Sequence, residues 1–157
     1  MLSLLLKPVS GLCNMNCSYC FYRDEISRRS SGNSGIMSEK TLENILKRAL
    51  DFSPDALLLG FQGGEPLLRG LPFYERLIEL EEKRGEKGRR IQRSLQTNGL
   101  LLDEAWCRFF KRHHFLIGLS LDGVRESHDR YRRDLSDAPS YQRILDRLLL
   151  LQRCSVD

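Results

Sequence analysis

The chain has no long hydrophobic run and little histidine or tryptophan. A membrane-spanning helix needs a run of about 18 or more apolar residues, and no such run is present, so the sequence predicts no transmembrane segment. The first ten residues, MLSLLLKPVS, lack a basic region ahead of their apolar run and lack a small-residue cleavage site. We therefore interpret them as a strand rather than a signal peptide, and we expect a cytoplasmic protein with no membrane partner.

The sequence also lacks a surface of one charge. Its net charge is only +4, and basic residues alternate with acidic ones through ERLIELEEKRGEKGRR, residues 75–90. Such alternation is typical of a solvated helix face. No aromatic residues are interleaved with the basic ones, so the sequence predicts no nucleic-acid partner.

The five cysteines do not form a disulfide framework in this interpretation, because the cytosol keeps thiols reduced. Cys107 and Cys154 lie in helical patterns and are interpreted as buried or inert, since a free cysteine behaves as a small hydrophobic residue. The other three, Cys13, Cys17 and Cys20, lie together in the stretch GLCNMNCSYCFY, residues 11–22. Their proximity needs another explanation.

Apolar runs of strand length alternate along the chain with segments of helical period. This alternation predicts an α/β fold with parallel strands joined by right-handed crossovers, as in a βα barrel or a doubly wound sheet. The stretch 27–35, SRRSSGNSG, is expected to be a flexible loop. The expected strands are 2–9, 56–62, 90–97 and 115–121, and the expected helices begin after Ser38, after Leu71, at Asp103 and near Ser140, the second ending between Gly85 and Gly88.

Each unusual motif follows the carboxyl end of an expected strand. The cysteines follow the first strand, and GGEP (63–66), TNG (97–99) and SLDG (120–123) follow or end the next three. These ends meet at one edge of a parallel sheet, so we expect the motifs to form one site. TNG and LDG can also be ordinary turns. Glu65 is either part of a tight turn or suited to holding an ammonium group.

The cysteine spacing, C-x3-C-x2-C, favours an iron–sulfur cluster over structural zinc. Zinc needs four protein ligands, and the three histidines lie far from the cysteines without knuckle spacing. A [4Fe–4S] cluster prefers thiolates, and three cysteines leave its fourth iron open to a substrate or cofactor. The three histidines are His113, His114 and His128. Structural zinc stays an alternative.

Taken together, these motifs resemble those of the radical S-adenosylmethionine (SAM) enzymes, with Tyr19 and Phe21 beside the last cysteine. The strings CNMNCSYCFY, FQGGEPLL, SLQTNGLLLDE and FLIGLSLDGVRESHDRYR are similar to those of anaerobic sulfatase-maturing enzymes, over nearly all of the chain. The resemblance implies that Cys13, Cys17 and Cys20 ligate a [4Fe–4S] cluster. The cluster would cleave S-adenosylmethionine to a 5′-deoxyadenosyl radical, which would oxidise a Cys or Ser of a sulfatase to Cα-formylglycine.

The resemblance also implies further site residues and partners. The partners would be the sulfatase polypeptide and an electron donor such as flavodoxin or ferredoxin. No catalytic base is assigned, because the resemblance would place it beyond Asp157. The cofactor-binding residues implied are Tyr19, Gln62, Gly63, Gly64, Glu65, Ser120 and Arg132, and the substrate-binding residues are Tyr22, Gln96, Thr97 and Asn98.

By the same resemblance, residues 1–157 would be the N-terminal part of a radical SAM core domain. They would form a partial (β/α) barrel of about four of its six βα units, and the C-terminal domain with auxiliary clusters would be absent. The strand 115–121 would then be an exposed edge that is prone to pairing. Two alternatives stay open: another peptide-modifying radical enzyme, which forms a thioether or carbon–carbon crosslink, and a non-catalytic module that binds iron–sulfur or zinc.

Overall fold

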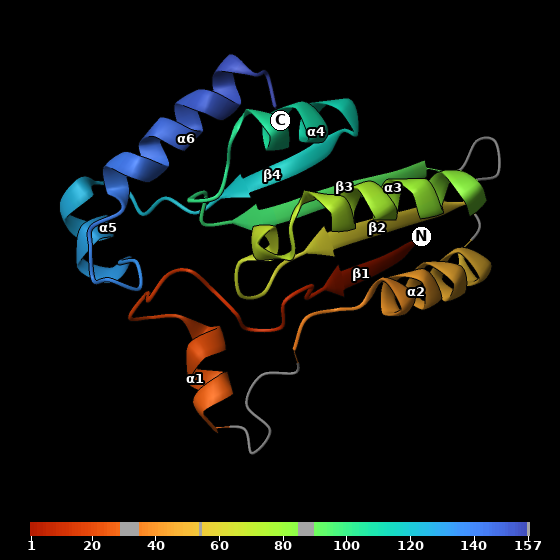
Figure 1. Ribbon diagram of the computed structural model, residues 1–157, viewed down its shortest axis with the longest axis horizontal. Helices are drawn as coiled ribbons and strands as arrows, with labels where there is room; N and C mark the ends of the chain where they lie inside the picture. The colour runs from red at the N-terminus through yellow and green to blue at the C-terminus, as the bar shows by residue number, and fades with distance from the viewer. Residues whose placement is uncertain (29–34, 54, 85–89, 157) are drawn as a thin grey trace.

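The computed structural model describes residues 1–28, 35–53, 55–84 and 90–156. Its centre is a sheet of four strands in the order β1-β2-β3-β4, and every neighbouring pair is parallel (Figure 1). The predicted α/β fold with a parallel sheet is therefore confirmed. The strands are β1 (Leu2–Leu6), β2 (Ala56–Phe61), β3 (Arg90–Thr97) and β4 (Phe115–Leu119).

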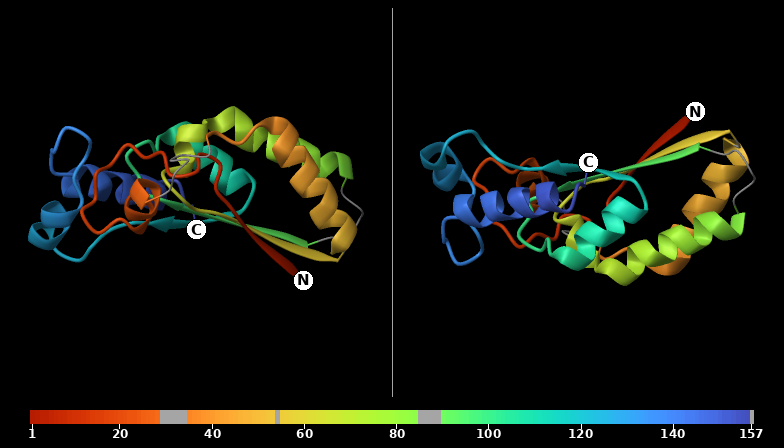
Figure 2. Two further views of the ribbon diagram at one scale, coloured as in Figure 1. Left: turned by 90° about the horizontal axis from the view of Figure 1, so that it is seen from below. Right: turned by 90° about the horizontal axis from the view of Figure 1, so that it is seen from above.

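Helices α2, α3 and α4 lie on one side of the sheet, as both views in Figure 2 show. Helices α1 and α5 and the 3-10 turn η1 were not predicted. Within the described ranges, no helix combines the length and the apolar character that a membrane span requires. Most of the predicted loop 27–35, and the predicted end of the second helix, fall outside the described residues. The helical elements are α1 (Phe21–Arg28), α2 (Glu39–Phe52), η1 (Pro66–Arg69), α3 (Leu71–Arg84), α4 (Glu104–Arg112), α5 (Arg125–Tyr131) and α6 (Tyr141–Arg153).

Two of the predicted helix starts carry side-chain caps. The Ser38 hydroxyl accepts a hydrogen bond from the Thr41 N–H at the start of α2, and the Asp103 carboxylate accepts one from the Trp106 N–H in α4. Helix α6 also begins where expected, but the Ser140 hydroxyl does not cap it. Its first N–H groups instead donate to the carboxylate of Asp129, which frees the hydroxyl for another contact.

Aromatic rings fill the space between the sheet and the helices. The ring of Tyr74 lies edge-on to those of Phe61 and Trp106, with centroid distances of 5.3 and 5.4 Å. Its hydroxyl donates to the Pro66 carbonyl at 3.0 Å. Because Pro66 belongs to the GGEP motif, the core closes directly beneath that loop, and the loop rests on rigid packing.

The opposite face of the sheet is largely uncovered within the described chain (Figure 2). Leu5 of β1 and Leu116 of β4 are 59% and 62% exposed there. Small residues on this face, Gly60 and Gly118 among them, leave a hollow of about 380 Å³. In a closed (β/α) barrel this face would line the interior, so the sheet has the form of a partial barrel.

A buried ion pair fastens α3 to the sheet. The carboxylate of Glu81 is 3% exposed and accepts hydrogen bonds from the guanidinium of Arg93 in β3, including one from Nε at 3.0 Å. Arg93 also donates to the His113 carbonyl at 3.1 Å. A buried charge is tolerated when its partner and its hydrogen bonds are both present.

Replacing Glu81 by Ala should lower the free energy of unfolding by about 3 kcal/mol, because the Arg93 charge would lose its buried partner. Urea unfolding followed by circular dichroism measures the change. The control is Glu79→Ala on the same helix, whose exposed pair with Arg76 should change stability by less than about 1 kcal/mol. Equal losses for the two variants would contradict the prediction.

Candidate functional site

All four sequence motifs lie at the carboxyl edge of the sheet. In Figure 1 the loop that follows β1 passes this edge together with the turns after β2, β3 and β4. The loop 12–20, which carries the three cysteines, contacts each of these turns: Glu65 reaches Leu12, Asn98 reaches Cys13, and Asp122 reaches Tyr19. The expected convergence is therefore observed.

The carboxylate of Glu65 joins the loops after β2 and β3. It is 1% exposed, and its Oε1 accepts from the Leu67 N–H at 3.0 Å and the Thr97 hydroxyl at 2.8 Å, while Oε2 accepts from the Asn98 N–H at 2.8 Å. Burial raises the pKa of Glu65, but every partner is a donor, so the contacts suit the ionised form. Its predicted contact with a cofactor amino group stays a prediction.

Asn98 extends this connection to the first cysteine. Its Nδ2 donates to the Asn14 side chain at 2.7 Å and lies 3.6 Å from the Cys13 sulfur. The Met15 N–H lies 3.4 Å from the same sulfur. Cys13 therefore has two N–H donors directed at it, which favours a thiolate, although burial raises its pKa.

The glycines of GGEP allow the loop after β2 to press against the cysteine loop. Gly64 has φ +59°, and a Cβ added to it would lie 2.1 Å from the Leu12 carbonyl oxygen. The next residue, Glu65, donates its N–H to that same oxygen at 2.8 Å. Only glycine permits both this backbone conformation and this approach.

The other side of the cysteine loop rests on the segment after α5. The Asn16 N–H donates to the Arg133 carbonyl at 2.7 Å, and the Ser18 N–H donates to the Tyr131 carbonyl at 2.9 Å. Met15 forms an antiparallel bridge with Asp134. The cysteine loop is thus held between two walls, one from β2 and β3 and one from the segment 131–134.

Three polar side chains meet next to the cysteines. Arg132 donates from Nη1 to the Tyr19 hydroxyl at 2.8 Å, and that hydroxyl hydrogen-bonds the Asp122 carboxylate. Arg132 is 7% exposed, and its Nε is a buried donor for which the described residues supply no acceptor. A buried N–H without a partner is costly, so this atom marks a place where an acceptor of a ligand would fit.

The three thiols are partly buried but do not converge on one point. Among the residues that the structure describes, no three His, Cys, Asp or Glu side chains are placed to hold one metal ion. Burial raises the pKa of Cys17, while the positive charge of Arg132 acts to lower it. In a cluster each thiolate binds a different iron, so the three sulfurs would not have to meet at one ion.

The predicted substrate residues lie in three places. Thr97 and Asn98 are buried against Glu65. Gln96 lines the hollow on the open sheet face together with Gln62, and its Nε2 donates to the Ser120 hydroxyl at 3.0 Å. A Cβ added at Gly118 would lie 2.2 Å from the Gln96 Oε1, so the Gln96 side chain would have to move to admit it. Tyr22 lies on α1 instead, with its ring 4.7 Å from the Lys7 ammonium.

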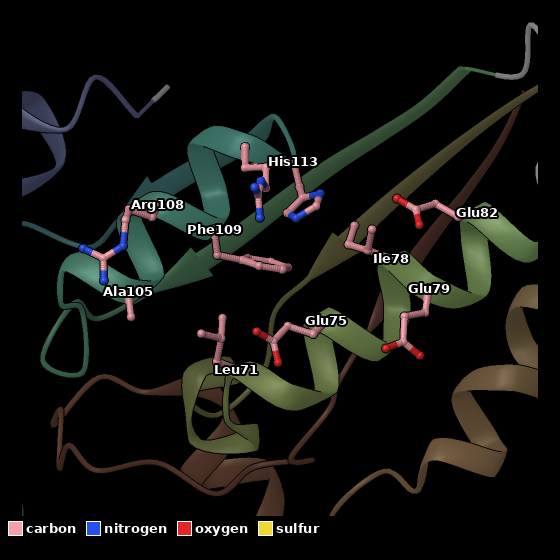
Figure 3. A pocket seen from close by; sticks show the side chains of 10 residues that line it. Leu71, Glu75, Ile78, Glu79, Glu82, Ala105, Arg108, Phe109 and His113 are labelled. Carbon is pink, nitrogen blue, oxygen red and sulfur yellow. The ribbon is translucent and has the colours of Figure 1, made fainter.

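A larger hollow, of about 720 Å³, lies between α3 and α4 (Figure 3). Glu75, Glu79 and Glu82 line it from α3, and Arg108 and His113 line it from α4. No residue of the four sequence motifs contributes to it. We therefore place the candidate site at the carboxyl edge and not in this groove.

The two remaining cysteines lie outside the site. Cys107 is fully buried in α4, and burial together with the neighbouring Cys154 raises its pKa to about 12. A thiol with such a pKa stays protonated near neutral pH and is a poor nucleophile or metal ligand. The structure thus agrees with the interpretation of Cys107 as an inert core residue.

Two residues of the site were not predicted from the sequence. Asp122 was interpreted as part of a turn, and His128 was considered only as a distant zinc ligand. Both belong to the hydrogen-bond network around Arg132 and Tyr19. A carboxylate directly after the fourth strand was the one signal that could have pointed to Asp122, whereas nothing local distinguishes His128.

The chain is similar to known proteins over almost its whole length. The model of the radical SAM superfamily matches residues 8–157. A cysteine-type anaerobic sulfatase-maturating enzyme of Clostridium perfringens is 44% identical over 143 residues, which are 91% of this chain and 39% of that protein. A serine-type anaerobic sulfatase-maturating enzyme of Bacteroides thetaiotaomicron is 34% identical, covering 99% of this chain and 38% of that protein.

Solved structures agree with these similarities. The native enzyme anSMEcpe with bound AdoMet and the Cp18Cys peptide superposes with a TM-score of 0.89 at 40% identity, covering 99% of this chain and 41% of that one. The same enzyme with AdoMet alone gives a TM-score of 0.91. The α/β fold and the partial barrel are thus confirmed. The chain spans about two fifths of the length of these relatives.

Replacing Gly64 by Ala should displace the cysteine loop, because the added methyl group would collide with the Leu12 carbonyl. We expect the variant to lose most of the iron that the parent chain takes up during anaerobic reconstitution, measured by a colorimetric iron assay.

Gly123→Ala is the matched control. Gly123 has φ +54°, close to that of Gly64, but a Cβ there meets no atom within 4 Å. This control should cost only the backbone strain, about 1–2 kcal/mol, and should retain its iron. Full iron uptake by Gly64→Ala would show that the close approach is not required.

Proposed function

Because the family model matches residues 8–157, the chain belongs to the radical SAM superfamily, and we propose that Cys13, Cys17 and Cys20 hold a [4Fe–4S] cluster that cleaves S-adenosylmethionine. The observation that carries this proposal is the cysteine loop held between two walls, with N–H donors directed at Cys13. When bound, the cluster supplies the single electron that breaks a carbon–sulfur bond of the cofactor. The protein contributes binding, orientation and charge.

The residues present fit such a cluster. Three free thiols lie on one loop at the C-x3-C-x2-C spacing. N–H groups directed at cluster sulfurs tune the reduction potential, and the donors from Met15 and Asn98 are suited to this at Cys13. The positive charge of Arg132 favours the thiolate form of Cys17. The fourth iron would stay without a protein ligand and would be available to the cofactor.

Arg132 is the proposed partner of the cofactor carboxylate. Its unpaired Nε is buried beside the cysteine loop, and a guanidinium binds a carboxylate more strongly than a neutral donor does. Tyr19 orients this guanidinium through its hydroxyl. The side chains of Gln62 and Ser120 would contact the same cofactor from the open face of the sheet.

The backbone of Gly63 and Gly64 is proposed to receive the methionine amino group. Their main-chain carbonyls can accept hydrogen bonds from an ammonium group, while the space that a Cβ would occupy at each position is already filled by Lys7 and Leu12. Glu65 would assist through its negative charge, while its observed hydrogen bonds keep the loop in place. The proposed division of roles is therefore that Glu65 positions the loop and the glycines contact the ligand.

The proposed substrate is a Cys or Ser side chain in a sulfatase polypeptide, which would be oxidised to Cα-formylglycine. This rests on the relatives, which include both cysteine-type and serine-type sulfatase-maturating enzymes. The peptide would enter over the hollow of about 380 Å³ on the open sheet face, where Gln96 lies. Thr97 and Asn98 would line its inner end, and Tyr22 would lie toward α1.

An electron donor such as flavodoxin or ferredoxin is the proposed second partner. Tyr19 and Phe21 lie on either side of Cys20 and are 53% and 66% exposed. Exposed aromatic side chains this close to the thiols offer a contact surface for a protein that must approach a cluster. The proposed location of both partners is the cytoplasm.

Anaerobic reconstitution with iron and sulfide should give the parent chain a brown cluster of about four irons, and dithionite with S-adenosylmethionine should then yield 5′-deoxyadenosine. Cys17→Ala should lose both, because one thiolate ligand is removed. Chromatography of the nucleoside product and iron analysis are the measurements. A Cys-x-Pro-x-Arg peptide added to the same reaction reports formylglycine as a change in mass.

The control is Cys154→Ala, which removes a thiol far from the loop and should retain the cluster. A single tetrahedral zinc in the parent chain, or an unchanged chromophore in Cys17→Ala, would contradict the proposed cluster. Formation of 5′-deoxyadenosine without any change in the peptide would support cofactor cleavage but not the proposed substrate. A crosslinked peptide would point to another peptide-modifying chemistry.

A further inference from the structure

His128 is a fully buried histidine in α5 that bridges two parts of the site. Its Nδ1 accepts a hydrogen bond from the Asp122 N–H at 3.2 Å, and its Nε2 lies 3.0 Å from the Ser140 hydroxyl. That hydroxyl donates to the Arg132 carbonyl at 2.7 Å, so it must accept from Nε2. The contacts therefore define a neutral imidazole with its proton on Nε2.

The two ring nitrogens act on the two partners of Tyr19. Nδ1 holds the backbone of Asp122, whose carboxylate bonds the Tyr19 hydroxyl. Nε2 holds the backbone of Arg132 through the Ser140 hydroxyl, and the Arg132 guanidinium donates to the same Tyr19 hydroxyl. One rigid ring thus sets the separation between a carboxylate and a guanidinium that meet beside the cysteines.

The same ring supports the segment 131–134, which forms the outer wall of the cysteine loop. Tyr131 and Arg133, on either side of Arg132, accept the N–H groups of Ser18 and Asn16 through their carbonyls. A shift of the Arg132 backbone would therefore move both hydrogen bonds. His128 itself touches neither a cysteine nor the hollow on the open sheet face in any described contact, so its effect would pass through other residues.

We propose that His128 is a positioning residue for the cofactor site, which directs the unpaired Nε of Arg132 toward the carboxylate of S-adenosylmethionine. This inference rests on the proposed function. A histidine with only a core role would affect stability without affecting cofactor affinity, whereas His128 is expected to affect cofactor affinity. The Ser140 hydroxyl is required as well, because it connects His128 Nε2 to the Arg132 carbonyl.

The test is the dissociation constant of S-adenosylmethionine on the anaerobically reconstituted chain, measured by equilibrium dialysis. Ser140→Ala removes the relay and leaves the imidazole, and it should weaken binding about tenfold or more while the cluster iron is retained. Ser140→Thr keeps the hydroxyl and should restore affinity. His128→Asn keeps an acceptor near Nδ1 but loses the donor at Nε2, so it should resemble Ser140→Ala.

A spectroscopic readout accompanies the binding measurement. The electron paramagnetic resonance spectrum of the reduced cluster should change on addition of S-adenosylmethionine in the parent chain and in Ser140→Thr. The same cofactor concentration should change it much less in Ser140→Ala. His113→Gln is the control histidine variant, because His113 ends α4 against Phe109 and lies outside this network.

The outcomes are distinguishable. Weaker cofactor binding by Ser140→Ala with rescue by Ser140→Thr supports the inference, even if His128→Asn does not fold. Lower melting temperatures with unchanged cofactor affinity in both Ser140→Ala and His128→Asn would overturn it and leave the proposed function intact. A parent chain that holds a cluster but binds no S-adenosylmethionine would overturn the proposed function and this inference together.

Discussion

Three donors from two neighbouring loops meet at the buried carboxylate of Glu65, and the geometry of the site depends on that meeting. Hydrogen bonds to a charged group contribute about 1.5–3 kcal/mol each, so this side chain can hold the turns after β2 and β3 together against their conformational freedom. The Asn98 amide then reaches Cys13, and the Glu65 N–H reaches Leu12. The Glu65 carboxylate thus holds together the inner wall, formed by the loops after β2 and β3, and sets the distance of this wall from the cysteine loop.

The outer wall complements this arrangement with neutral groups. Backbone carbonyls of the segment 131–134 accept N–H groups of the cysteine loop, and His128 and Ser140 hold that segment from behind. A loop held on both sides can present three thiols in a defined arrangement before any cluster binds, which lowers the entropy cost of binding. The unpaired Nε of Arg132 is left at the boundary between the two walls, where a cofactor carboxylate would satisfy it.

Sequence patterns predicted the parts of this structure that follow from local rules. Strand and helix alternation predicted the parallel sheet and hence the convergence of four motifs, and the helices expected to begin at Ser38 and Asp103 do begin there. Contacts between distant residues were not predictable, because no local signal encodes them. The Ser140 hydroxyl serves Arg132 rather than its own helix, and α5 is too short to show a clear period. The TNG motif is likewise more than a turn, because Thr97 and Asn98 contact Glu65 and Cys13, which are distant in the sequence.

The most direct test of the central claim is a comparison of Glu65→Gln with the parent chain and with Glu75→Gln, an exposed glutamate of α3, in urea unfolding and iron uptake. An amide at position 65 cannot accept from all three donors, because its NH₂ group would face either Asn98 or the pair Leu67 and Thr97. We expect Glu65→Gln alone to lose about 1–3 kcal/mol of unfolding free energy and most of its cluster binding. Parent-like stability and iron content in Glu65→Gln would contradict the central claim.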